Sequence, residues 1–251
     1  MDRNTKHNKA MAKQKAAVDE GIAKADVERG VSVLLTGDGK GKTSSAFGMV
    51  MRALGYGQKV GVVQFIKGVQ ASGEENFVRD HLTGVNLHQM GTGFTWDTQD
   101  RESDIAAAKR TWERALAMLG DASYNLVVLD ELTYMLAFDY LPEDEVISAL
   151  TGRPESQSVV VTGRGGGQAL REAMDSVSEA KEVKHAYRAG IRARQGVDYY
   201  KWAPTRRSAP PPSSATNSST RSFSGCLSAR CLCCTHPCPR RCSPQAASDS
   251  R

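Results

Sequence analysis

The chain has 251 residues and a formal net charge of +5 at pH 7. Much of the positive charge lies in the first fifteen residues and after residue 204, so the nearly neutral middle gives little support for a nucleic-acid-binding face. No apolar run approaches the ~18 residues that span a bilayer, and the first residues are too polar for a secretion signal. We therefore expect a cytoplasmic protein that has neither a nucleic acid nor a membrane as a partner.

Composition divides the chain into three parts. Residues 1–29 are rich in Lys and Ala and favour an N-terminal helical arm. Residues 30–200 have the mixture of a single folded domain, whereas residues 201–251 are rich in Ser, Pro, Arg and Cys and predict a disordered tail. The tail is either a native extension or the translation of a shifted reading frame. All six cysteines lie in it, at spacings that do not match a zinc site.

Apolar periodicity predicts alternating strands and helices. Residues 31–35 form an apolar strand, 44–54 a helix and 60–66 a second strand, which together make a βαβ unit. Further strands are expected at residues 85–89, 126–129, 158–162 and 176–179, with helices at 100–119 and from Pro142 onward. We predict an α/β protein with a RecA-like P-loop fold, in which an open, mostly parallel sheet carries helices on both faces. Its site should lie at the carboxyl ends of the strands.

A glycine-rich segment joins the first strand to the first helix of this unit. It matches G-x-x-x-x-G-K-[ST], except that a threonine takes the place of the first glycine. Backbone N–H groups, the helix N-terminus and the lysine can bind phosphate oxygens, and the final threonine can offer its hydroxyl to Mg²⁺. Arg52 could also reach a phosphate. The predicted ATP-binding residues are Thr36, Gly37, Asp38, Gly39, Lys40, Gly41, Lys42, Thr43 and Arg52.

The strand at 126–129 ends in two acids, Asp130 and Glu131. A carboxylate at the carboxyl end of a strand beside a phosphate loop can bind Mg²⁺, directly or through water. The sequence therefore predicts Thr43, Glu131 and Asp130 as contacts for Mg²⁺, with Mn²⁺ as a substitute. These motifs indicate nucleotide binding and leave the reaction open.

Four further segments narrow the function. They read V-V-Q-F-I-K-G at 62–68, G-T-G-F-T-W-D-T at 91–98, L-D-E-L-T-Y at 129–134 and V-T-G-R at 161–164. With the phosphate loop, they closely resemble the P-loop type of corrinoid adenosyltransferase, over about residues 28–199. That family's loop tends to read T-G-x-G-K-G-K-T, which accounts for Thr36. Asp38 stands where the family often has Asn.

The resemblance implies an enzyme that transfers the 5′-deoxyadenosyl group of ATP to Co(I) of a corrinoid and releases triphosphate, in adenosylcobalamin synthesis or salvage. Co(I) is so strong a nucleophile that no general base is needed. Lys42 would hold the triphosphate as leaving group. Phe94 and Trp96 would exclude a lower axial ligand from cobalt, although the residues alone favour ordinary packing for both. A homodimer and a flavodoxin-like or flavin reductant are also implied.

Two other classes stay open at this point. A RecA-like ATPase could couple hydrolysis to the movement of a nucleic acid or a solute, because Glu131 could polarise water. A nucleotide-dependent regulator or corrinoid chaperone would bind the same ligands without turnover. The products distinguish the three classes: triphosphate and an adenosylated corrinoid, ADP and phosphate, or none.

Overall fold

The structure, a computed structural model, describes residues 2–66, 72–91 and 100–197. The chain divides into two units, Met1–Pro204 and Thr205–Arg251, and every described element belongs to the first. The predicted tail at 201–251 lies outside the described residues, so its boundary stays a prediction. Within the described ranges, no helix is both long enough and apolar enough to cross a bilayer.

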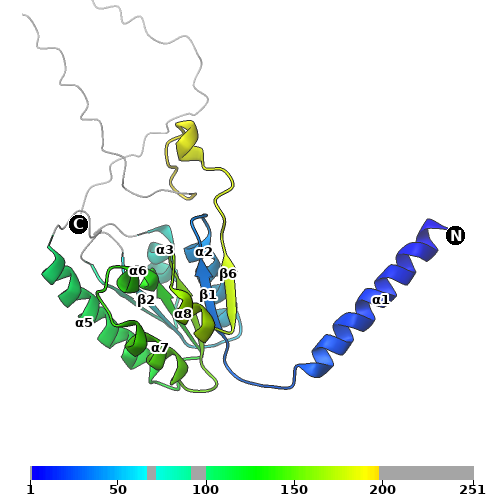
Figure 1. The fold of residues 1–251 in the computed structure, drawn as a ribbon, viewed down its shortest axis with the longest axis horizontal. Helices are drawn as coiled ribbons and strands as arrows, with labels where there is room; N and C mark the ends of the chain where they lie inside the picture. The colour runs from blue at the N-terminus through cyan, green and yellow to red at the C-terminus, as the bar shows by residue number, and fades with distance from the viewer. Residues whose placement is uncertain (1, 67–71, 92–99, 198–251) are drawn as a thin grey trace, which may run out of the picture. The chain divides into compact units, whose positions relative to one another are not determined.

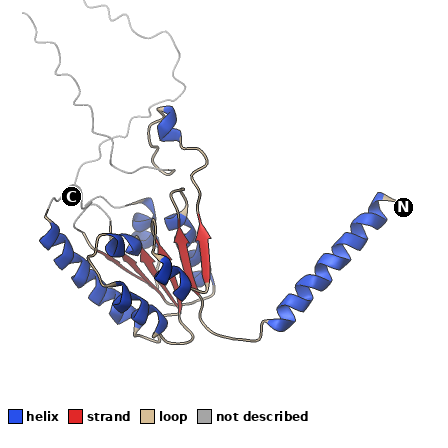
Figure 2. Ribbon diagram, in the orientation of Figure 1, coloured by secondary structure: helices blue, strands red, loops and turns tan. Residues whose placement is uncertain are grey.

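The centre of the fold is a parallel sheet (Figures 1 and 2). Its order is β3-β2-β4-β5-β1-β6, and each neighbouring pair is parallel. This confirms the predicted sheet, with strand ends shifted by one or two residues at most. The strands are β1 (Ser32–Thr36), β2 (Val60–Gln64), β3 (Val85–Gln89), β4 (Leu126–Asp130), β5 (Ser158–Thr162) and β6 (Ser176–Glu179).

Helices cover both faces of the sheet, as the α/β prediction requires. Because successive strand residues point to opposite faces, neighbours such as Val128 and Leu129 enter different cores. Val128 packs with Phe47 of the first face, whereas Leu129 packs with Trp112 of the second. The first face carries α2 (Lys42–Gly55) and α3 (Gly73–His81), and the second carries α5 (Arg101–Leu119), α6 (Leu132–Ala137), α7 (Glu143–Thr151) and α8 (Gln168–Ala173).

Three of these helices, α3, α6 and α8, were not expected from the sequence. Helix α3 begins with a capping box, in which Ser72 accepts from the N–H of Glu75 and Glu75 accepts from the N–H of Ser72. The pattern Ser-x-x-Glu is a recognisable start signal and could have identified this helix. Helices α6 and α8 have six residues each, too few for a periodic apolar pattern.

The N-terminal arm contains helix α1 (Arg3–Lys24), which has no buried residue. Two pairs four residues apart, Lys15 with Asp19 and Lys24 with Glu20, lie along it. Such exposed pairs each add only a few tenths of a kcal/mol, on the order of 0.2–0.5. The helix therefore depends mainly on its Ala and Lys content, as the composition predicts.

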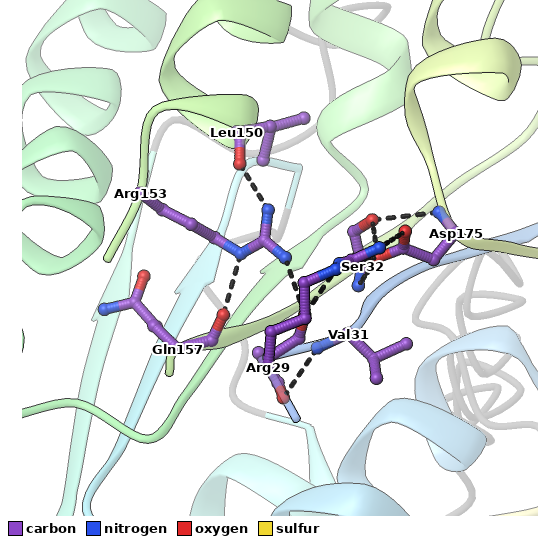
Figure 3. A network of polar contacts seen from close by, with 9 residues as sticks. Arg29, Val31, Ser32, Leu150, Arg153, Gln157 and Asp175 are labelled. Atoms are coloured by element: carbon purple, nitrogen blue, oxygen red, sulfur yellow. Dashed lines mark hydrogen bonds and ion pairs between the residues drawn. The ribbon is translucent and has the colours of Figure 1, made fainter. Parts of the chain in front are cut away.

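A polar network ties β1 and β6 together at the amino edge of the sheet (Figure 3). Asp175 precedes β6 and accepts hydrogen bonds from Arg29 at 2.9 and 2.5 Å, from the N–H of Ser32 at 2.8 Å and from its hydroxyl at 2.7 Å. The bond from Arg29, and then those from Ser32, hold the pKa of Asp175 far below its usual range. Arg153 completes the edge by donating to three backbone carbonyls, those of Gly30, Leu150 and Gln157.

Candidate active site

The glycine-rich loop lies where the sequence places it, between β1 and α2, at the carboxyl edge of the sheet. The N–H of Gly39 donates to the carbonyl of Ala180 over 2.6 Å, and the N–H of Ala180 donates to Thr36 over 2.8 Å. A Cβ at Gly37 or Gly39 would meet the Ala180 carbonyl oxygen at 2.5 or 2.7 Å. These two positions therefore require glycine, because the chain leaving β6 passes directly against the loop.

Lys42 is the first residue of α2, and its side chain folds back over the loop. Its Nζ donates to the carbonyls of Gly37 at 2.7 Å and Gly39 at 2.8 Å. Partial burial lowers the pKa of Lys42 below its ordinary value, while the negative charge of Glu131 opposes this shift. The ammonium is thus held within the phosphate loop, where it can meet phosphate oxygens.

Asp130 ends β4, is fully buried, and accepts hydrogen bonds at both carboxylate oxygens. Its Oδ1 accepts from the hydroxyl of Thr43 at 2.9 Å and from that of Thr162 at 2.6 Å. Its Oδ2 accepts from the amide of Gln64 at 2.8 Å. The structure thereby joins the strand end to the phosphate loop, and the roles of Thr43 and Asp130 as Mg²⁺ contacts stay predictions.

Two glutamines extend this cluster across the sheet. Gln64, at the end of β2, is paired with Asp130 on one side and with Gln89 of β3 on the other. Its side-chain oxygen accepts from Nε2 of Gln89 at 2.9 Å. Gln64 is fully buried and Gln89 is half-buried. Three neighbouring strands thus place one row of polar side chains at their carboxyl ends.

Glu131 follows Asp130 and begins α6 in a left-handed backbone conformation, with φ of 63°. Its N–H donates to the hydroxyl of Thr162 at 3.0 Å, so Thr162 bridges the two acids. A non-glycine residue with positive φ is uncommon and costs on the order of 1 kcal/mol or more. The strained turn allows β4 to pass directly into α6 beside the loop.

The segment after β5 closes another side of the site. Gly163 has φ of +138°, and a Cβ there would meet the hydroxyl of Thr133 at 2.1 Å. The hydroxyls of Thr36 and Thr133 donate to the carbonyls of Gly165 at 2.6 Å and Arg164 at 2.7 Å. This turn places Arg164 Nε 4.0 Å from Asp38 Oδ1, so the guanidinium lies at the phosphate loop.

A cavity of about 1180 Å³ adjoins the loop. Cavities that hold cofactor-sized ligands have volumes of roughly 300–1000 Å³, so this space could admit a nucleotide. Acids and bases both face it, with an excess of basic groups among the lining residues. They include Asp38, Arg164, Lys181, Lys184, His185 and Arg188.

Three predicted site residues are not shown next to the phosphate loop and Asp130 by the part of the chain that the structure describes. Arg52 is exposed in the last turn of α2, about 15 Å from Lys42 along a helix that rises ~1.5 Å per residue. Its contact with phosphate stays a prediction. Phe94 and Trp96 lie outside the described residues, so their roles also stay predictions.

Sequence reasoning missed Gln64, Gln89 and Thr162 as members of the site. All three end strands of one parallel sheet, and in such sheets the ligand site lies at the carboxyl ends. A polar residue closing each strand was therefore a usable signal. Arg164 reaches the loop only because β5 lies beside β1, a pairing that no local pattern in the sequence shows.

The donor atoms around Thr43 fit a magnesium ion. They are hydroxyl and carboxylate oxygens, the hard ligands that Mg²⁺ prefers. Among the described residues there is no cluster of three or more His, Cys, Asp or Glu side chains that could form a complete metal cage. Mg²⁺ usually keeps several waters and binds one or two carboxylates together with substrate phosphates, so it does not require such a cage.

The parallel sheet, the phosphate loop and the acid-ended strand define a P-loop α/β protein. A family model described as ATP:corrinoid adenosyltransferase BtuR/CobO/CobP matches residues 28–199. The chain belongs to this family.

Curated relatives agree with this assignment. The corrinoid adenosyltransferase of Escherichia coli (strain K12) is 54% identical over 185 residues, which cover 74% of this chain and 93% of that protein. The corrinoid adenosyltransferase CobA of Salmonella typhimurium is 50% identical, over 77% of this chain and 98% of that protein. A corrinoid adenosyltransferase from Sinorhizobium sp. is 40% identical, over 78% and 92%.

Proposed function

We propose that this protein is a transferase that moves the 5′-deoxyadenosyl group of ATP to Co(I) of a corrinoid and releases triphosphate, in the synthesis or salvage of adenosylcobalamin. One observation carries the proposal. In a chain of the corrinoid adenosyltransferase family, the hydroxyl of Thr43 at the phosphate loop is hydrogen-bonded to Asp130 at the strand end. The proposed phosphate and metal sites would thus meet at one point of the sheet edge.

The reaction is a nucleophilic substitution at carbon. The electron pair of Co(I) forms the cobalt–carbon bond to C5′, and the bond from C5′ to the α-phosphate oxygen breaks with its pair on triphosphate. Cobalt is thereby oxidised to Co(III), and no proton has to be removed from the nucleophile. The protein must position two large substrates and stabilise the leaving group.

The residues of the loop are suited to that second task. Lys42 can exchange its bonds to the carbonyls of Gly37 and Gly39 for bonds to phosphate oxygens. Its charge then lies where negative charge develops as triphosphate departs. Thr43, Asp130 and Glu131 are the residues that would hold Mg²⁺, and Mn²⁺ could replace it. When bound, the ion supplies further positive charge to the triphosphate.

Phe94 and Trp96 complete the proposal on the corrinoid side. Two apolar aromatic side chains next to the cobalt can exclude both a lower axial ligand and water. Removing that ligand makes reduction of Co(II) to Co(I) easier. Both residues follow β3 in the sequence, within ten residues of its end.

A hydrolysing ATPase that moves a nucleic acid or a solute is the less favoured function. The chain covers 93% and 98% of the relatives from Escherichia coli (strain K12) and Salmonella typhimurium, both of which are named corrinoid adenosyltransferases. The proposed reaction also needs no activated water at the γ-phosphate. We further propose a cytoplasmic homodimer that receives electrons from a flavodoxin-like protein or a reduced flavin.

The decisive experiment is a product assay. Purified protein is incubated with ATP, Mg²⁺ and chemically reduced cob(I)alamin, and the cobalamin spectrum is followed while the phosphate products are separated. We expect adenosylcobalamin and triphosphate in equal amounts. Steady release of ADP and orthophosphate without a change in the cobalamin spectrum would overturn the proposal.

A further inference from the structure

We propose that Gln64 and Gln89 are positioning residues for the metal site, and that they act in series through Asp130. This inference rests on the proposed magnesium site. The three residues lie in one row of the sheet, at paired positions on β3, β2 and β4. Hydrogen bonds of 2.9 Å from Gln89 to Gln64 and 2.8 Å from Gln64 to Asp130 join them.

The direction of this relay is fixed by chemistry. An ionised carboxylate only accepts hydrogen bonds, so Gln64 must turn its NH₂ group towards Asp130. Its carbonyl oxygen then faces Gln89, which must in turn present an NH₂ group. The charge of Asp130 therefore sets the orientation of both amides. Conversely, the two amides can hold the carboxylate in one orientation.

That orientation decides which oxygen faces the phosphate loop. Oδ2 of Asp130 is directed towards Gln64, which leaves Oδ1 for the hydroxyls of Thr43 and Thr162. Groups that hydrogen-bond a metal-binding carboxylate align its oxygens for the ion, and their loss typically lowers metal affinity about 10–100-fold. Gln64 is fully buried, so no bulk water can replace its amide.

The backbone reinforces the link between β3 and β2. Gln89 ends β3, and the N–H of Met90 donates to the carbonyl of Gln64 at 3.0 Å. A backbone bond thus joins β3 to β2 beside the side-chain relay, which leads from Gln89 through Gln64 to Asp130.

The test compares three variants: Gln64→Met, Gln89→Met and the double variant. Methionine keeps the length of the side chain and removes the amide. Mn²⁺ serves as the probe, and its binding in the presence of ATP is titrated by electron paramagnetic resonance, a readout independent of turnover. We expect Gln64→Met to weaken Mn²⁺ binding about 10–100-fold and Gln89→Met about 3–10-fold. The double variant should be no weaker than Gln64→Met, because a relay in series is lost once its central link is removed.

The control variant is Asn86→Ala, on the same strand as Gln89. Asn86 donates to the hydroxyl of Tyr124 at 2.9 Å and has no bond to the relay, so Mn²⁺ binding should match wild type. Thermal unfolding and metal-free ATP binding check each variant for a general loss of structure. If Gln64→Met does not fold, Gln89→Met at its half-buried position still decides the matter.

The outcomes separate this inference from the proposed function. If wild type transfers the adenosyl group and binds Mn²⁺ with ATP, yet both single variants bind Mn²⁺ normally, the relay has no positioning role. Additive losses in the double variant would equally overturn it. If wild type fails to bind Mn²⁺ in the presence of ATP, the proposed metal site fails and this inference fails with it.

Discussion

The ammonium of Lys42 donates a hydrogen bond to the carbonyl of Gly37 over 2.7 Å. A second bond joins the ammonium to the carbonyl of Gly39, so two loop carbonyls occupy donors that could otherwise bind phosphate. Partial burial leaves its charge incompletely solvated and thereby lowers the pKa of this lysine. A polyphosphate offers stronger acceptors than neutral carbonyls, so it can displace them.

Lys42→Ala should therefore abolish ATP binding, with an affinity loss of at least about 100-fold, since Lys42 can exchange two hydrogen bonds to carbonyls for bonds to phosphate, each of which contributes roughly 1.5–3 kcal/mol. Titration calorimetry with MgATP measures this loss. Lys59→Ala is a suitable control, because Lys59 bonds Ser123 at the other edge of the sheet. Equal ATP affinity in Lys42→Ala and wild type would exclude Lys42 from the phosphate site.

Thr162→Val should weaken both the fold and the metal site. The change removes the hydroxyl that donates to Asp130 at 2.6 Å and accepts from Glu131 at 3.0 Å. Leaving buried partners unsatisfied costs about 1–3 kcal/mol, which urea unfolding would detect. Thr151 is exposed at the end of α7, and its hydroxyl donates to carbonyls of the same helix. Thr151→Val should therefore lower the free energy of unfolding by less than ~1 kcal/mol. A wild-type stability for Thr162→Val would contradict the bridging role of this hydroxyl.

Gly163→Ala should destabilise the protein by about 2–3 kcal/mol, because the backbone has a positive φ and the new Cβ would meet the hydroxyl of Thr133 at 2.1 Å. Gly48→Ala provides the contrast. Gly48 is exposed in α2, and a Cβ added there would have nothing within 4 Å, so alanine should stabilise the helix by ~1 kcal/mol. Chemical denaturation of both variants checks the pair, and a neutral Gly163→Ala would show that the turn after β5 adapts freely.

The Asp175 network predicts a dependence of stability on pH. Its hydrogen bonds depress the pKa of Asp175 in the folded protein, so the group stabilises the fold above its unfolded pKa of ~3.9 and loses this contribution as pH falls towards the folded value. Asp175→Asn should be less stable than wild type at pH 7, and the difference should shrink below about pH 4. Unfolding free energies measured at pH 7 and pH 3 test this. A difference that is constant with pH would contradict an ionic contribution.

Phe94→Ala and Trp96→Ala should spare ATP binding and chiefly impair the reaction that starts from Co(II). Chemically prepared cob(I)alamin bypasses the reduction, so both variants should retain more of their activity with it than with cob(II)alamin and a reductase. Parallel assays from the two oxidation states measure the ratio. If both variants matched wild type from Co(II), the exclusion of a lower ligand by these side chains would be wrong.

Local sequence patterns predicted most of the strands and the longer helices. The strands were found because short apolar runs ended at turn residues, and α5 was found because acids opened a periodic apolar face that includes Trp112. The short helices α6 and α8 gave no such pattern. The contribution of Arg164 depends on the adjacency of β5 and β1, which are separated by more than 120 residues along the chain.

The sequence by itself determined that a phosphate loop follows a strand, that two acids end another, and that these motifs with three further segments resemble a known family. Such features are local, because a few neighbouring residues define each. Only the tertiary structure decided that Thr43, Thr162 and Gln64 converge on Asp130, since strand order selects which ends become neighbours. That order arises from packing two apolar cores on opposite faces of one sheet, a global property that no single segment encodes.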